Sequence, residues 1–191
     1  AVSEARGDII LASDADCIFT PYWVQTMASY FAENKIKLVS APVCFTKQEG
    51  FFQSLQALEF ISLIGSGAGA IGIKDPIFCN GANMAYRKEV FLEVNNFKKD
   101  NVVSGDDVFL LHSVKARYPN SIVFAKDKNA IVITDSEKKL LDFFNQRKRW
   151  ASKSSKYTDI SSIYTSYLVL FTNLSFTFLF LMLFFDIAFL N

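Results

Sequence analysis

Short apolar runs that alternate with helical segments fill the first three quarters of the chain. Because strands and helices follow one another in turn, the pattern predicts an α/β domain. The runs with the length and β-branched content of strands lie at 8–12, 36–43, 122–124 and 130–133. The segments that we expect to be helical are 21–34, 51–64, 88–94, one opening at Gly105-Asp106-Asp107, and one capped by Ser136 that runs through Trp150.

The glycine-rich stretch Gly65-Ser66-Gly67-Ala68-Gly69 follows the second helical segment. A phosphate-binding loop is one interpretation. The stretch lacks the Gly-Lys-Ser/Thr ending of such loops, however, and it does not lie between a strand and a helix. We therefore expect a flexible loop.

From Ile160 to Phe185 the chain carries no charged residue. This length suffices to cross a bilayer, which needs about 20 residues. The flank before it is basic, so the positive-inside rule predicts that this flank, and the globular part with it, is cytoplasmic. A buried core helix is the alternative interpretation. The basic residues of the flank are Arg147, Lys148, Arg149, Lys153 and Lys156.

The overall composition agrees with a membrane-associated chain in a reducing compartment. The hydrophobic fraction is 51%, with 20 Phe, and much of this excess lies near the C-terminus. The net charge of +1 gives no bulk attraction to nucleic acid, so no nucleic-acid partner is expected. Three cysteines, an odd number without metal-ligand spacing, indicate free thiols.

Two carboxylates, Asp14 and Asp16, follow the first apolar run. Residues two apart on a strand point to the same side, so both would project together just beyond the strand end. A divalent metal is the usual compensator for such a pair. Taken alone, the pair fits a solvated turn better than a metal site, because Asp is common in turns.

A second acidic pair, Asp106-Asp107, opens the helix that contains Val108, Leu111 and Val114. Acids in a first helical turn are favoured by the helix dipole, and this is the structural interpretation of the pair. The single histidine, His112, falls within the same helix and is expected to be structural rather than a ligand.

Gln146, Arg149 and Trp150 stand at i, i+3 and i+4, so they share one helix face. An amide, a guanidinium and an indole suit a ligand that has phosphate and sugar parts. A basic helix at a membrane interface with a Trp anchor is the alternative.

The motifs occur in a fixed order: Asp-x-Asp, Asn80-Gly81 within Asn-Gly-Ala-Asn-Met-Ala-Tyr-Arg-Lys-Glu, Gly-Asp-Asp, and Gln-x-x-Arg-Trp before an apolar helix. In this combination the chain resembles the membrane-bound family 2 glycosyltransferases, the group of cellulose, chitin and hyaluronan synthases. The resemblance runs from about Glu4 to the C-terminus. It implies transfer of a sugar from a nucleotide-diphosphate sugar to a saccharide or lipid acceptor, with inversion.

The resemblance also implies a role for each motif residue. Asp16 and Asp14 would bind Mg²⁺ or Mn²⁺ and the nucleotide sugar, and Asp107 would be the general base. Gln146 and Arg149 would hold the diphosphate. The acceptor would contact Trp150, Asn80, Gly81 and Asp106, where the family commonly has Glu at the position of Asp106.

The implied architecture is a partial GT-A (Rossmann-like) domain over residues 1–135, an interfacial helix over 136–159 and a transmembrane helix over 160–188. The protein would be integral to the cell membrane, with the catalytic domain in the cytoplasm. The first strands of the family fold are expected upstream of Ala1 and further membrane helices beyond Asn191, so the fragment itself is expected to be inactive.

Two other functions fit part of the pattern. A metal-dependent phosphotransferase or nucleotidyltransferase could use the same acids, but it leaves the Gln146, Arg149 and Trp150 face unexplained. A catalytically silent, membrane-anchored saccharide-binding or export component would make Asp107 dispensable. The donor sugar, the acceptor and the processivity do not follow from these motifs.

Overall fold

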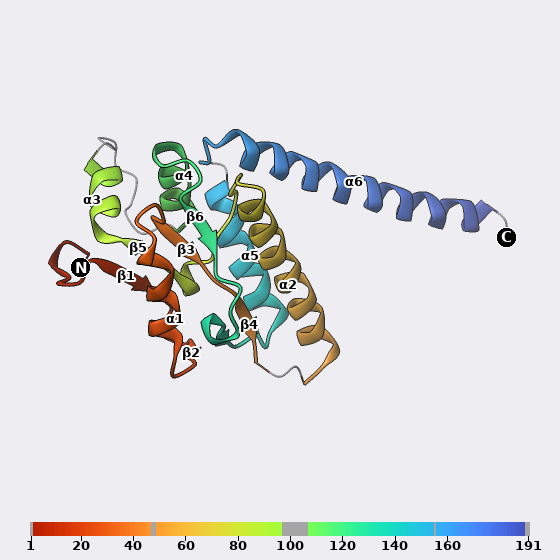
Figure 1. The fold of residues 1–191 in the computed structure, drawn as a ribbon. Helices are drawn as coiled ribbons and strands as arrows, with labels where there is room; N and C mark the ends of the chain where they lie inside the picture. Colours follow the sequence, from red (N-terminus) through yellow and green to blue (C-terminus); the bar gives the residue numbers. More distant parts are fainter. Residues whose placement is uncertain (1, 47–48, 97–106, 155, 190–191) are drawn as a thin grey trace. The chain divides into compact units, whose positions relative to one another are not determined.

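The computed structural model describes residues 2–46, 49–96, 107–154 and 156–189 (Figure 1). The chain forms two compact units, residues 1–145 and 146–191. The first unit is a mixed α/β domain, which confirms the expected fold class. Its helices are α1 (Trp23–Ser29), α2 (Phe51–Gly72), α3 (Lys88–Asn96) and α4 (Asp107–Arg117), with short 3-10 turns η1 (Val2–Glu4), η2 (Tyr30–Ala32), η3 (Gly81–Asn83) and η4 (Lys128–Ala130).

A four-stranded sheet lies at the centre of the first unit, in the order β1-β5-β3-β6. Strands β3 and β6 are parallel, and β5 is antiparallel to both β1 and β3. Strands β1, β3 and β6 therefore end at the same sheet edge, where β5 begins. The strands are β1 (Ile9–Ala12), β3 (Leu38–Ser40), β5 (Met84–Arg87) and β6 (Ile122–Phe124).

The register of this sheet decides which loops meet. Ala12 and Ser40 both pair with Met84, and Ser40 also pairs with Phe124. The segment after Ala12 and the segment before Met84 consequently emerge side by side. These are the Asp-x-Asp turn and the Asn80–Asn83 segment.

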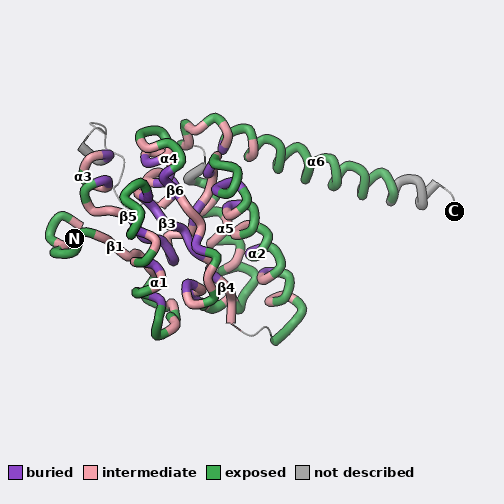
Figure 2. The backbone as a smooth tube through the Cα atoms, in the orientation of Figure 1, coloured by how far each residue is buried: buried purple, intermediate pink, exposed green. Residues whose placement is uncertain are grey.

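Side chains alternate between the two faces of the sheet, as a period of two requires. In β3, Val39 packs with Trp23 and Met27 of α1, whereas Leu38 packs with Leu111 and Val114 of α4. The expected apolar face of α4 is thus confirmed. Figure 2 shows the buried residues concentrated on the strands and on the inward sides of these helices.

The run at 36–43 is not one strand, which corrects the expectation from its apolar pattern. It ends as β3 at Ser40, and Val43 begins β4 (Val43–Phe45) in a second sheet, β2-β7-β4. Pro42 lies between the two strands and has no N–H to donate to a ladder. The carbonyl of Pro42 instead accepts from the Val132 N–H at 3.0 Å. The remaining strands of this sheet are β2 (Ile18–Phe19) and β7 (Val132–Thr134).

The expected flexible loop at 65–69 is wrong, because these residues continue helix α2 to Gly72. Gly67 is buried, and a Cβ there would lie 3.1 Å from the Phe78 carbonyl oxygen. The small residues therefore let the helix backbone approach the neighbouring chain closely. Burial of Ala70 and Ile71 offsets the low helix propensity of glycine.

Helix α5 (Leu140–Ser154) begins four residues after the predicted cap, Ser136. The buried side chain of Gln56 explains the delay. Its Nε2 donates to the Glu137 carbonyl at 2.9 Å, and its Oε1 accepts from the Glu137 N–H at 3.2 Å. The backbone at Glu137 is therefore held by α2 before the helix starts.

Two helices are long and apolar enough to cross a membrane: α2, and α6 (Ile160–Phe189) over its residues 160–183. Helix α2 packs within the first unit through residues such as Phe60, which stacks on Phe45 of β4 with ring centroids 4.5 Å apart. In α6, every residue from 166 to 183 is exposed.

Candidate functional site

The Asp-x-Asp pair lies in a turn directly after β1. The Cys17 N–H donates to the Asp14 carbonyl at 3.2 Å and closes the turn, and both carboxylates are exposed. The Thr134 hydroxyl, at the end of β7, donates to Asp16 Oδ2 at 3.1 Å. Asp16 is thus oriented by a residue of the second sheet.

A hydrogen bond joins this turn to the segment before β5. The Ser13 hydroxyl donates to the Ala82 carbonyl at 2.7 Å. Within that segment, Asn80 Oδ1 accepts from the Ala82 N–H at 2.9 Å and caps η3. The Asp-x-Asp turn and Asn80-Gly81, both predicted as site residues, are therefore neighbours.

Asn83 fixes η3 to the rest of the first unit. Its side chain is fully buried, its Oδ1 accepts from Trp23 Nε1 at 3.0 Å, and its Nδ2 donates to the carbonyls of Pro42 and Ala130, each at 2.7 Å. One amide thereby ties helix α1 to the chain at both sheets. Buried polar groups satisfied in this way add rigidity to their surroundings.

Asp107 is the first residue of α4 and contacts the same segment. The Gly81 N–H donates to Asp107 Oδ2 at 2.6 Å, and the Val108 N–H donates to Oδ1 at 3.0 Å. The Cys79 thiol lies 3.4 Å from the Asp107 carbonyl oxygen. The structure thus brings Asp107 to Gly81, while Asp106 lies outside the described residues.

His112 has a structural contact, as expected. Its Nε2 lies 3.2 Å from the carbonyl oxygen of Ile77, and since a carbonyl can only accept, this nitrogen donates. The contact joins α4 to the chain that leads into Cys79. His112 of α4 therefore helps to hold the segment before Cys79 against the helix that begins with Asp107.

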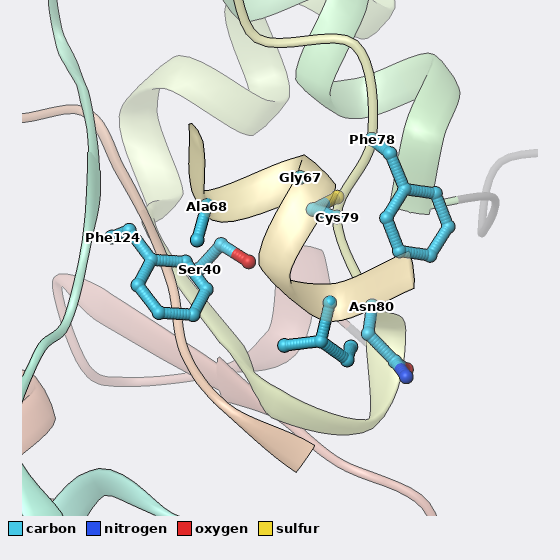
Figure 3. Close-up of a pocket in the computed structure, with 8 residues that line it drawn as sticks. Ser40, Gly67, Ala68, Phe78, Cys79, Asn80 and Phe124 are labelled. Atoms are coloured by element: carbon cyan, nitrogen blue, oxygen red, sulfur yellow. The ribbon is translucent and has the colours of Figure 1, made fainter. Parts of the chain in front are cut away.

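A shallow depression lies beside this edge, and Ser40, Gly67 and Asn80 are among the residues that line it. It holds no enclosed space large enough for a water molecule. Figure 3 shows Ala68 of α2 beside Ser40 and Phe124, which end their strands, and Gly67 on the side of Phe78 and Cys79. We assign no ligand to it.

The second compact unit begins at Gln146, within α5. Arg149 is exposed, and Gln146 and Trp150 are partly buried. Arg147 was not predicted as a site residue, but its Nη1 donates to Gln146 Oε1 at 2.6 Å and its guanidinium carbon lies 4.3 Å from the centre of the Trp150 ring. Arg147 therefore orders the amide and the indole of the motif.

The donor set fits a hard divalent cation that also binds a phosphate ligand. No group of three or more His, Cys, Asp or Glu side chains suited to a metal occurs among the described residues. Mg²⁺ commonly binds through one or two carboxylates, with substrate phosphates completing its coordination. The exposed oxygens of Asp14 and Asp16 match that chemistry.

Sequence reasoning missed three residues beside the acidic motifs of the first unit, Ser13, Thr134 and Asn83. In the second unit it missed Arg147, which binds Gln146. Ser13 and Arg147 adjoin predicted motifs, so their position was a usable signal. Thr134 binds Asp16, which is 118 positions away in the sequence. Asn83 binds Trp23, which is 60 positions away. Such pairings depend on the tertiary fold.

Solved structures with related folds include three complexes of glucosyl-3-phosphoglycerate synthase from Mycobacterium tuberculosis. The complex with Mn²⁺, UDP-glucose and glycerol 3-phosphate is 18% identical over 78% of this chain and 48% of that chain, with a TM-score of 0.47. The complex with Mn²⁺ and UDP-glucose is 16% identical with the same coverage and TM-score. The complex with phosphoglyceric acid is 18% identical over 75% and 46%, with a TM-score of 0.46.

The chain thus spans about half the length of these synthases. The comparison with curated protein sequences gives no significant match. The family model described as "Glycosyl transferase family group 2" matches residues 9–190, which is nearly the entire chain. The chain therefore belongs to glycosyl transferase family group 2.

Proposed function

We propose that the protein is a glycosyltransferase that moves a sugar from a nucleotide-diphosphate sugar to a saccharide or lipid acceptor at the cytoplasmic face of a membrane, with inversion. The observation that carries the proposal is the sheet register at Met84. It aligns the end of β1, which leads into Asp14 and Asp16, with the segment whose Gly81 contacts Asp107. The family's donor and base motifs are thereby neighbours.

Asp14 and Asp16 would hold Mg²⁺ or Mn²⁺ together with the donor diphosphate. When bound, the cation supplies positive charge beside the leaving nucleoside diphosphate. Thr134 keeps Asp16 oriented by its hydroxyl, so less ordering remains when the donor arrives. The chain's own contribution to this step is a pair of exposed carboxylates on a closed turn.

Asp107 would act as the general base. Both of its carboxylate oxygens accept backbone N–H groups, and it stands at a helix N-terminus, where negative charge is favoured. The acceptor oxygen attacks the anomeric carbon as the bond from that carbon to the diphosphate oxygen breaks. The acceptor proton passes to Asp107, and the electron pair leaves with the nucleoside diphosphate.

Gln146 and Arg149 would grip the diphosphate, and Trp150 would offer a platform to the acceptor. Asn80, Gly81 and Asp106 would shape the acceptor pocket. The cation–π contact from Arg147 supports this use of Trp150, because it holds the indole ring in one orientation.

The membrane-bound subtype, with the cellulose, chitin and hyaluronan synthases, is part of the proposal. Its support is α6, whose residues 166–183 are all exposed and contain no charge. Such a surface suits hydrocarbon better than water. The basic flank before α6 favours a cytoplasmic catalytic domain.

The test is nucleoside diphosphate release by the full-length protein in membranes, with a panel of nucleotide sugars and with Mg²⁺, Mn²⁺ or chelator. We expect one donor to be consumed and the chelator to stop the reaction. Asp16→Ala should weaken donor binding, whereas Asp8→Ala, at an exposed position outside the motif, should not. If no donor is consumed with either metal, a silent saccharide-binding or export component becomes the better account.

A further inference from the structure

We propose that Gly81 is a positioning residue for the general base: its N–H and its missing side chain fix the Asp107 carboxylate. This inference rests on the proposed role of Asp107 and deepens it. It also moves Gly81 from the acceptor pocket to the support of the base.

A hydrogen bond from the Gly81 backbone holds the Asp107 carboxylate. The Gly81 N–H donates to Asp107 Oδ2 at 2.6 Å, and hydrogen bonds to a carboxylate are stronger than those between neutral groups. The Val108 N–H binds the other oxygen at 3.0 Å. A carboxylate held at both oxygens by backbone groups has little freedom to rotate, and a base must be within hydrogen-bond reach of the proton that it takes.

Position 81 leaves little space for a side chain next to Asp107. A Cβ on Gly81 would lie 3.1 Å from Asp107 Oδ2 and 3.3 Å from both its Cβ and its Cγ. These distances are shorter than ordinary van der Waals contacts, so a side chain at position 81 would push the Asp107 side chain aside by a few tenths of an ångström. The carboxylate and its contact with the N–H at position 81 would shift with it.

The segment that carries Gly81 is held by several hydrogen bonds on both sides of it. Asn80 caps η3, Ser13 binds the Ala82 carbonyl, and Asn83 is buried and makes three hydrogen bonds. The N–H of Gly81 is thus presented from a fixed turn rather than from a free loop. Its position is set by the same contacts that place the Asp-x-Asp turn beside it.

The test compares Gly81→Ala with Gly69→Ala in the full-length protein. Gly69 lies in α2 and has no atom within 4 Å of an added Cβ, so it controls for the substitution itself. Turnover is measured per donor-binding site, which corrects for any inactive fraction. We expect Gly81→Ala to lose roughly 10-fold or more in kcat, part of the about 10²–10⁴ that a positioned base supplies. The KM for the acceptor should stay within twofold, and Gly69→Ala should match the wild type.

Two measurements keep the inference testable if Gly81→Ala does not fold. Asp107→Glu keeps the carboxylate but lengthens it, and we expect it to lose kcat almost as fully as Asp107→Asn. In the wild-type protein, the Gly81 amide proton should shift with pH as Asp107 titrates, and this shift should vanish in Asp107→Asn.

The outcomes separate the two claims. Suppose that Asp107→Asn is inactive. If Gly81→Ala then keeps the wild-type kcat, with or without a raised KM for the acceptor, the positioning role is overturned and the base assignment stands. Full turnover by Asp107→Asn overturns the base assignment itself, and the positioning role with it. A Gly81 amide proton whose chemical shift does not change with pH also overturns the positioning role.

Discussion

The hydroxyl of Thr134 donates a hydrogen bond of 3.1 Å to Asp16 Oδ2, although the two residues are 118 positions apart in the chain. Thr134 is the last residue of β7, and β7 pairs with β2, which follows the Asp-x-Asp turn. A residue of the second sheet therefore orients Asp16, a proposed metal ligand in the turn after β1 of the first sheet.

Removing this hydroxyl should weaken metal binding. In Thr134→Val, Asp16 loses one donor while the volume of the side chain is kept. We expect the Mn²⁺ concentration for half-maximal nucleoside diphosphate release to rise roughly two- to tenfold, the worth of one hydrogen bond. Thr134→Ser keeps the hydroxyl and should stay near the wild type. Equal metal dependence in Val and Ser variants would contradict this role.

Replacing Asn83 should destabilise the first unit. Asn83→Leu leaves the buried Trp23 indole N–H and the Ala130 carbonyl without their amide partner. We expect the free energy of unfolding to fall by roughly 2–4 kcal/mol, since each buried group deprived of its partner costs about 1–3 kcal/mol. Chemical denaturation followed by tryptophan fluorescence measures it. Asn34→Leu, at an exposed position, provides the control and should change little.

Helices α3 and α4 are joined by Glu93, which accepts from the Tyr118 hydroxyl and, at 3.1 Å, from Arg117 Nε. The Tyr118 bond, followed by that from Arg117, lowers the pKa of Glu93 below its ordinary 4.5. The same bond raises the pKa of Tyr118 above its ordinary 10.0. The pair therefore stabilises the fold while Glu93 is charged and Tyr118 is neutral.

The pH dependence follows from these signs. The contribution of Glu93 is complete above pH 4.5 and is lost as the pH falls through its lowered native pKa. That of Tyr118 is complete below pH 10.0 and is lost as the pH rises through its raised pKa. Thermal melts of wild type and Tyr118→Phe should therefore differ most between these limits. A constant difference from pH 3 to pH 11 would argue against the pair.

A charge in the middle of α6 should impair membrane insertion. Phe176 is exposed within the apolar stretch, and arginine at a helix centre costs about 2.5–3.5 kcal/mol on insertion scales. We expect Phe176→Arg to move protein from the carbonate-resistant membrane fraction to the soluble or aggregated fraction. Phe176→Leu should remain in the membrane. Release of the wild-type protein by carbonate would exclude a spanning helix.

Much of the first unit could be predicted from the sequence, because local pattern decided it. The strands at β1 and β6 and the buried positions Val108, Leu111 and Val114 followed from apolar runs and helical spacing. The errors arose where a tertiary contact outweighed local preference. Gly67 stays in a helix because it packs on Phe78, and α5 starts late because Gln56 holds Glu137.

The candidate site was predictable as a set of motifs but not as a set of contacts. The order of Asp14, Asp16, Gly81 and Asp107 indicated which residues belong to it. The bond from Gly81 to Asp107 joins positions 26 apart and depends on how η3 meets the start of α4. Neither the hydrophobic period of the chain nor the spacing of its motifs predicts that contact.

The turnover of Asp107→Asn decides whether Asp107 is the base of sugar transfer. The measurement is nucleoside diphosphate release by the full-length protein, per donor-binding site, beside Asp8→Asn as the matched control. We predict a loss of about 100-fold or more for Asp107→Asn with donor binding retained, and no loss for Asp8→Asn. Turnover within twofold of the wild type in Asp107→Asn, with Asp16→Ala unable to bind donor, would contradict the claim.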